Sequence, residues 1–270
     1  MVKIRFYFLP ILLFMPLLSF ACLEERAGKD EIKPTLRIAV ASNFRPAMKK
    51  LVPVFLKSHA IMIRWQSASS GAIFNQIIHG APYDLFLSAD SEKPQKLIQK
   101  HHATAASLQT YALGKLVWYE PDKRHPSLLT MKNPPAIITI ANPKIAPYGK
   151  AAAEVIKKLN HKNISFKKVI VASNILQAFQ YIHTGNIAAG FVAYAQIINL
   201  ELKNNFWVIP SHWYQPIKQQ AVIVQSAHTK QAQQFLDFLQ TETARKIIRE
   251  MGYDLPTKTT GLKGNEHDTR

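Results

Sequence analysis

Two hydrophobic patterns alternate along residues 36–258. Short, mostly apolar runs such as 36–41 have the length of buried strands. Between these runs, apolar residues recur every three or four positions, as at Ala152, Val155 and Leu159, which is the spacing of an amphipathic helix. This alternation predicts an α/β fold in which mainly parallel sheets are flanked by helices.

The pattern is most informative in the segment 67–90. A Ser-Ser-Gly turn at 69–71 stands directly before apolar residues at helical spacing, and that stretch ends at Gly80. Hydroxyl residues at the start and glycine at the end are typical of a short helix. A buried strand is predicted at 85–87, and Asp90 is interpreted as the cap of the next helix.

Four predicted strand-to-helix turns carry hydroxyl, amide or small side chains. They are Ser42-Asn43, Ser69-Ser70, Pro147-Tyr148-Gly149 and Ser173-Asn174. The first N–H groups of a helix have no partner within the helix, which favours an anion there. Ligands of open α/β sheets also bind at the carboxyl ends of the strands. If the turns converge, they form a pocket of backbone N–H groups and neutral hydroxyls that suits a dehydrated oxyanion; otherwise each is only a helix cap.

The chain is predicted to form two lobes. The apolar run 111–119 has the pattern of one strand, and the Pro-rich loop after it indicates a crossing into a second lobe. A second crossing is expected near 207–216, before a last strand and two closing helices. The predicted boundaries are 36–115 and 211–258 for lobe 1, 116–210 for lobe 2, and 259–270 for a disordered tail.

The N-terminus has the pattern of a secretory signal. Two basic residues precede an apolar run that ends in small residues at Ala21, and this run is short for a membrane span. We predict a signal peptide over 1–21, a polar tether over 22–35 and a periplasmic location. Cys22 is the only cysteine, so no internal disulfide is expected. Its place after Ala21 leaves two alternatives open, a lipid anchor on Cys22 or ordinary cleavage.

The chain is strongly basic, with 34 Lys and Arg against 17 Asp and Glu and a formal net charge of +17. This balance fits an anionic ligand, nucleic acid or an acidic membrane. Because the basic residues are scattered and the aromatic residues form no stacking motif, we expect no nucleic-acid partner. No phosphate-binding loop, dinucleotide-binding or hydrolase motif occurs, and Asp84 and Asp90 form no obvious acid–base pair. We therefore expect neither an enzyme nor a cofactor.

Several short motifs occur together in this chain. They are Val40-Ala-Ser-Asn-Phe44, Ser69-Ser70-Gly71, Gly80-Ala-Pro82-x-Asp84-Leu-Phe-Leu-Ser-Ala-Asp90, Tyr111-Ala-x-Gly114 and Phe235-Leu-Asp-Phe-Leu239 with Gly252-Tyr253. Together they resemble the periplasmic molybdate-binding proteins of ABC transporters, over about residues 36–256. The resemblance implies a monomeric type II binding protein with a ligand cleft between its lobes. It would close on molybdate or tungstate and deliver the anion to an inner-membrane ABC permease.

The resemblance also implies which residues hold the oxyanion. In lobe 1, Asn43, with Ser42 beside it, and Ser70 match the family's ligands. In lobe 2, Tyr148 and Ile175 match them, Ile175 through its backbone N–H. These residues would contact molybdate only through its oxygens.

The chain departs from the family pattern in a late strand. Many members carry a ligand tyrosine directly after that strand's Gly-Ile-Val, where this chain has Ala193 and then Tyr194. We assign the phenol to Tyr148 instead, and the sequence leaves the place of Tyr194 open. Two alternatives also stay open, a binding protein for sulfate or phosphate and a basic envelope protein that binds anionic polymers. An enzyme acting on an anionic substrate ranks third, since no nucleophile or base can be named.

Overall fold

The structure is a computed structural model that describes residues 33–198, 200, 204–225 and 228–256, which form one compact unit. The predicted signal peptide, Cys22 and the predicted tail lie outside the described residues. None of the helices among the described residues is long and apolar enough to cross a bilayer.

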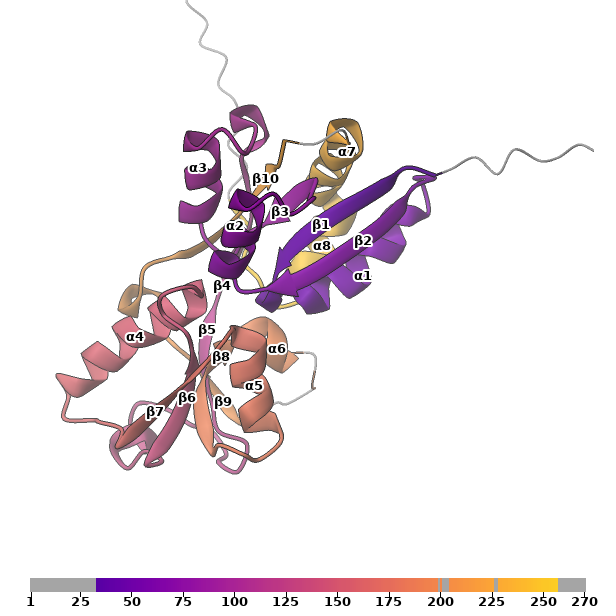
Figure 1. The fold of residues 1–270 in the computed structure, drawn as a ribbon. Helices are drawn as coiled ribbons and strands as arrows, with labels where there is room; N and C mark the ends of the chain where they lie inside the picture. Colours follow the sequence, from indigo (N-terminus) through magenta and orange to yellow (C-terminus); the bar gives the residue numbers. More distant parts are fainter. Residues whose placement is uncertain (1–32, 199, 201–203, 226–227, 257–270) are drawn as a thin grey trace, which may run out of the picture. The chain divides into compact units, whose positions relative to one another are not determined.

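The first sheet has five strands in the order β2-β1-β3-β10-β4 (Figure 1). The strands are β1 Thr35–Ala41, β2 Met62–Ala68, β3 Leu85–Leu87, β4 Gln109–Gly114 and β10 Ile217–Ile223. The helices of this half are η1 Ser42–Phe44, α1 Arg45–Leu56, α2 Ser70–Ile78, α3 Glu92–Gln99, η2 Ala105–Ser107, α7 Thr229–Gln240 and α8 Glu242–Glu250. We call this half lobe 1.

The second sheet also has five strands, in the order β7-β6-β8-β5-β9. The strands are β5 Leu116–Tyr119, β6 Ile137–Ala141, β7 Lys168–Ala172, β8 Ala189–Ala193 and β9 Phe206–Val208. The helices of this half are η3 Thr130–Lys132, α4 Pro147–Asn160, α5 Ile175–His183, α6 Tyr194–Ile198 and η4 Ser211–Trp213. We call this half lobe 2.

The α/β fold is confirmed, and each sheet is mixed. In lobe 1, β1 pairs in parallel with β2 and β3, whereas β10 is antiparallel to β3 and β4. Lobe 2 repeats this arrangement, because β6 is parallel to β7 and β8 and β5 is antiparallel to β8 and β9. The antiparallel pairings arise where the chain leaves one sheet and returns to it.

The apolar run 111–119 is not one strand. It divides at Lys115 into β4, in the first sheet, and β5, in the second. The first crossing between the lobes therefore lies at Lys115, and the Pro-rich loop that follows connects β5 to β6 within lobe 2. The chain returns between β9 and β10. The predicted lobe boundaries at 115 and 210 stay a prediction. In the structure the chain changes sheet between β4 and β5 and again between β9 and β10.

Apolar clusters on both faces hold each sheet in place. In lobe 1, Phe55 of α1 and Phe235 of α7 share one cluster, whereas Ile77 of α2 and Leu97 of α3 belong to another. In lobe 2, one cluster joins α4 to its sheet, and a second joins α5 to it. Burial of these side chains supplies the main driving force for folding and holds helices α2, α4 and α5 against their sheets.

Candidate functional site

The predicted ligand residues meet at one small cavity. It is lined by Ala41, Ser42, Asn43, Ser69, Ser70, Ala89, Ala146, Pro147, Tyr148 and Ile175. All five residues implied by the resemblance are in this set, which combines residues of both lobes. Apart from Pro147, each lining residue exposes 4% of its surface or less. The cavity volume is about 10 Å³, room for roughly one water molecule.

The start of α2 divides its hydroxyls between two tasks. The Ser69 hydroxyl accepts a hydrogen bond from the Ala72 N–H at 3.3 Å, so Ser69 is the helix cap. The Ser70 hydroxyl accepts one from the Ala89 N–H at 2.9 Å. Since this bond uses an oxygen lone pair, the Ser70 proton is left to donate. Ser70 is therefore the donor of this turn, and Ser69 stabilises the helix.

At the start of α5, one backbone N–H is available to a ligand. The Asn174 side chain accepts from the N–H groups of Leu176 and Gln177, at 2.9 and 3.0 Å. The N–H of Ile175 has no acceptor in the described part of the chain, and Ile175 lines the cavity. Ser173 and Asn174 do not line it. The fourth predicted turn thus contributes only through Ile175.

The start of α4 supplies Tyr148. Pro147 is the first helical residue, where its missing N–H costs nothing, and Lys150 donates the first helical hydrogen bond to Ala146. The phenol oxygen of Tyr148 accepts from the Gln219 amide at 3.2 Å. Its proton can therefore be donated to a ligand.

Asn43 lies at the cavity, but its side-chain amide is already used. The Asn43 Nδ2 donates to Gln219 Oε1 at 2.9 Å and to the Tyr253 hydroxyl at 3.1 Å, and that hydroxyl donates to the Asn43 carbonyl at 2.8 Å. By contrast, the Ser42 hydroxyl makes no hydrogen bond within the described residues. Ser42 is therefore the free side-chain donor of this turn, and Asn43 offers its backbone N–H.

Three buried residues behind the cavity have no counterpart in the sequence-based set. Gln219 is fully buried on β10, and its Oε1 also lies 3.1 Å from the Tyr111 hydroxyl. Tyr111 contacts the Ser88 carbonyl at 3.0 Å, and Tyr253 holds Asn43. The two tyrosines occur in the resembling motifs without an assigned role. The one local signal for Gln219 is an amide two residues after Ile217 and two before Ala221, both of which are buried.

The cavity is uncharged. None of the described residues that line it is Asp, Glu, His, Lys or Arg. Burial raises the pKa of Tyr111, Tyr148 and Tyr253 well above the usual value, so all three phenols are neutral at physiological pH. The described residues also contain no group of three His, Cys, Asp or Glu that could hold a metal cation. The arrangement can donate hydrogen bonds to an anion without adding positive charge.

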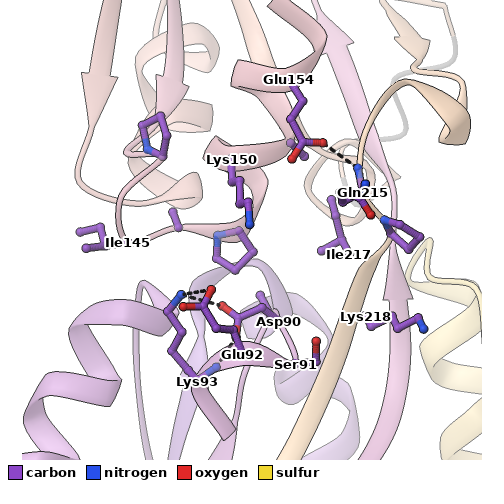
Figure 2. A pocket seen from close by; sticks show the side chains of 16 residues that line it. Asp90, Ser91, Glu92, Lys93, Ile145, Lys150, Glu154, Gln215, Ile217 and Lys218 are labelled. Carbon is purple, nitrogen blue, oxygen red and sulfur yellow. Dashed lines mark hydrogen bonds and ion pairs between the residues drawn. The ribbon is translucent and has the colours of Figure 1, made fainter. Parts of the chain in front are cut away.

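A larger hollow of about 590 Å³ lies beside the cavity and shares Ala89, Ala146 and Pro147 with it. Figure 2 shows its charged lining from both lobes, with Lys150 and Glu154 on one side and Asp90, Glu92 and Lys93 on the other. Asp90 caps α3 by accepting from the Lys93 N–H at 2.8 Å, as predicted, and burial raises its pKa. Three carboxylates and three lysines line this hollow, and Lys93 is paired with Asp90 and Glu92, so it offers an oxyanion no net positive charge.

Tyr194 and Asp84 lie away from the cavity. The ring of Tyr194 packs 5.5 Å from that of Phe206, so it does not stand in for the late-strand ligand tyrosine. Asp84 is fully buried, where it accepts from the Arg37 N–H at 2.7 Å and contacts His228 at 3.1 Å. These contacts give Asp84 a structural role.

The chain is similar in sequence and fold to known binding proteins. The molybdate-binding protein ModA of Rhodobacter capsulatus is 38% identical over 218 residues, which cover 80% of this chain and 86% of the relative. The Azotobacter vinelandii ModA is 35% identical over 226 residues, covering 82% and 90%. The structure of the Azotobacter vinelandii periplasmic molybdate-binding protein matches with a TM-score of 0.73, covering 82% of this chain and all of that one. A family model described as bacterial extracellular solute-binding protein matches residues 36–254. The chain therefore belongs to the bacterial extracellular solute-binding proteins.

Proposed function

We propose that this protein captures molybdate, or tungstate, in the cavity and delivers it to an ABC permease. The observation that carries the proposal is the convergence of neutral donors from both lobes at one buried point. The 38% and 35% identities to molybdate-binding proteins favour molybdate among the oxyanions. Proteins of this family bind solutes for transport, so the chain is a binding protein and not an enzyme.

The available donors suffice for micromolar binding. They include the hydroxyls of Ser42, Ser70 and Tyr148 and the N–H groups of Asn43 and Ile175. A hydrogen bond to a charged group contributes about 1.5–3 kcal/mol, and micromolar affinity needs about 8 kcal/mol. At about 2 kcal/mol or more per bond, five or six such bonds leave a surplus for desolvation and lobe closure.

The ligand must enter by separation of the lobes. The cavity has room for roughly one water molecule, whereas a tetrahedral oxyanion has four oxygens around its central atom. The lining residues are also almost fully buried. We infer that the lobes move apart to admit the anion and close around it.

Calorimetry with molybdate, tungstate, sulfate and phosphate tests the assignment. We expect tight binding of the two metal oxyanions and much weaker binding of the two smaller anions, because the donors are fixed around one radius. Heat from sulfate or phosphate alone would favour the alternative oxyanion-binding role. If the protein instead binds anionic polymers through its basic surface, that affinity will fall steeply with salt, unlike binding in a closed cavity.

Family membership places the function outside the cytoplasm, and we propose the periplasm as its site. We propose that residues 1–21 direct export, that the mature protein is a monomer, and that an inner-membrane permease is its partner. Mass spectrometry of the mature N-terminus would distinguish a lipid-modified Cys22 from ordinary cleavage.

Removing one donor from either lobe should weaken binding measurably. Ser70→Ala deletes a hydroxyl whose proton is free, and Tyr148→Phe deletes the buried hydroxyl but keeps the ring. We expect each to cost about 1–3 kcal/mol of binding free energy. Titration calorimetry measures the effect, with Ser173→Ala as control, since Ser173 belongs to a predicted turn but does not line the cavity. Unchanged affinity in both Ser70→Ala and Tyr148→Phe would show that the anion binds somewhere other than this cavity.

Binding should be insensitive to pH while stability falls in alkali. In the unfolded chain, tyrosines ionise near pH 10. Because burial raises the pKa of Tyr111, Tyr148 and Tyr253, the folded state keeps protons that the unfolded chain loses. The three tyrosines therefore contribute fully to the free energy of unfolding below about pH 10. This contribution is lost as the pH rises further. Urea unfolding between pH 7 and 11 tests this, and a constant free energy of unfolding would contradict it.

A further inference from the structure

A backbone contact joins the lobes beside the cavity. The N–H of Gly71, the second residue of α2 in lobe 1, donates to the carbonyl of Ile145 in lobe 2 at 2.9 Å. A Cβ atom on Gly71 would lie 2.9 Å from the Cα, the Cβ and the carbonyl oxygen of Ile145. These separations are shorter than real Cβ contacts, so the two chain segments can meet this closely only because residue 71 has no side chain.

The glycine is not required by lobe 1 itself. Gly71 is not among the described residues with positive φ, and it lies in the first turn of a helix, where alanine is the better helix former. The three atoms nearest to its missing Cβ all belong to Ile145. The demand for glycine therefore comes from the opposite lobe and exists only when the lobes are together.

The contact is coupled to the ligand through α2. Of the first three N–H groups of this helix, that of Ala72 is taken by Ser69 and that of Gly71 by Ile145. The N–H of Ser70 remains for the anion, next to the Ser70 hydroxyl. Adjacent residues of one helical turn thus serve the ligand and the closed contact.

We propose that Gly71 is a closure latch: the hydrogen bond from Gly71 to Ile145 forms when the lobes meet and slows release of the anion. Gly71 is a positioning residue, because the ligand itself is held by its neighbours. The proposal rests on the proposed function, since it concerns retention of the oxyanion in the same cavity.

The test compares Gly71→Ala with Asn75→Ala in molybdate binding and thermal unfolding. Asn75 is exposed on the same helix, so its replacement changes helix propensity without reaching Ile145. In Gly71→Ala, we expect the ligand-free Tm to stay the same or rise, because alanine favours the helix. We expect its Kd to rise about 10- to 100-fold, mainly through faster dissociation in stopped-flow measurements. Asn75→Ala should keep the wild-type Kd.

Three outcomes would overturn the latch. An unchanged Kd in Gly71→Ala would show that the lobes close without this contact. A lower ligand-free Tm together with weaker binding would show that Gly71 serves folding of lobe 1. Slower association with unchanged dissociation would place its effect before closure. If the wild-type protein binds none of the four anions, the proposed function fails first and the latch fails with it.

Discussion

Replacement of Gln219 by leucine is expected to raise the Kd for molybdate by about 100-fold or more and to lower the free energy of unfolding by about 2–4 kcal/mol. The Gln219 amide is fully buried and bonded to Asn43, Tyr111 and Tyr148. Leucine has a similar size but no polar atoms. In the variant, the polar groups of these three partners would stay buried and lose their hydrogen bond to residue 219. Loss of the Gln219 bond also frees the phenol of Tyr148 to turn away from the cavity.

The neighbouring glutamine provides a matched control. Gln220 donates to the Thr110 hydroxyl at 3.1 Å, but its Oε1 is buried with no hydrogen-bond partner among the described residues. Gln220→Leu removes this unsatisfied oxygen, so we expect a stability change within about 1 kcal/mol and a wild-type Kd. Calorimetry and urea unfolding measure both quantities. Equal losses of affinity and stability in Gln219→Leu and Gln220→Leu would mean that the hydrogen bonds of the Gln219 amide have no specific effect on the site.

Gly149→Ala is expected to displace the start of α4 and with it Tyr148. A Cβ atom at Gly149 would lie 2.2 Å from the carbonyl oxygen of Ala141, at the end of β6. Because that oxygen belongs to the backbone of a central strand, the helix must move. We expect a loss of about 2–4 kcal/mol in stability, as for an overpacked core, and a Kd at least about tenfold higher.

Gly185→Ala separates loss of stability from loss of the site. Gly185 has a φ of 76° at the end of α5, and a Cβ there meets no atom within 4 Å. Alanine in this conformation costs about 1 kcal/mol, while the start of α5 keeps its place. Gly185→Ala should therefore be less stable but bind normally. If it binds as weakly as Gly149→Ala, the affinity loss reflects stability alone.

The sequence indicates where the helices around the candidate site begin, because helix starts are encoded locally. The turns around Ser42, Ser70 and Tyr148 were recognisable from their residue types, and they meet at the cavity. What each side chain does there depends on distant partners. The Asn43 side chain donates to Gln219 and Tyr253, which lie 176 and 210 positions farther along the chain. No local pattern indicates that these two residues are its partners.

The division of the chain into lobes was harder to locate for a related reason. Tyr111 and Ala112 of β4 and all four residues of β5 are buried, so the apolar pattern continues across the crossing without a break. Pro-rich composition predicts a crossing in the loop after β5, whereas the chain changes sheet at Lys115. Sheet membership is set by pairing with β10 and β8, which no neighbouring residue encodes.

The strand order of the first sheet constrains the order of assembly. β10, from the last quarter of the chain, lies between β3 and β4, whereas all five strands of the second sheet come from residues 116–208. A polypeptide emerging N-terminus first can complete lobe 2 before lobe 1. Any fragment that stops short of Ile217 leaves β3 and β4 with unpaired edges, which invite pairing with other chains.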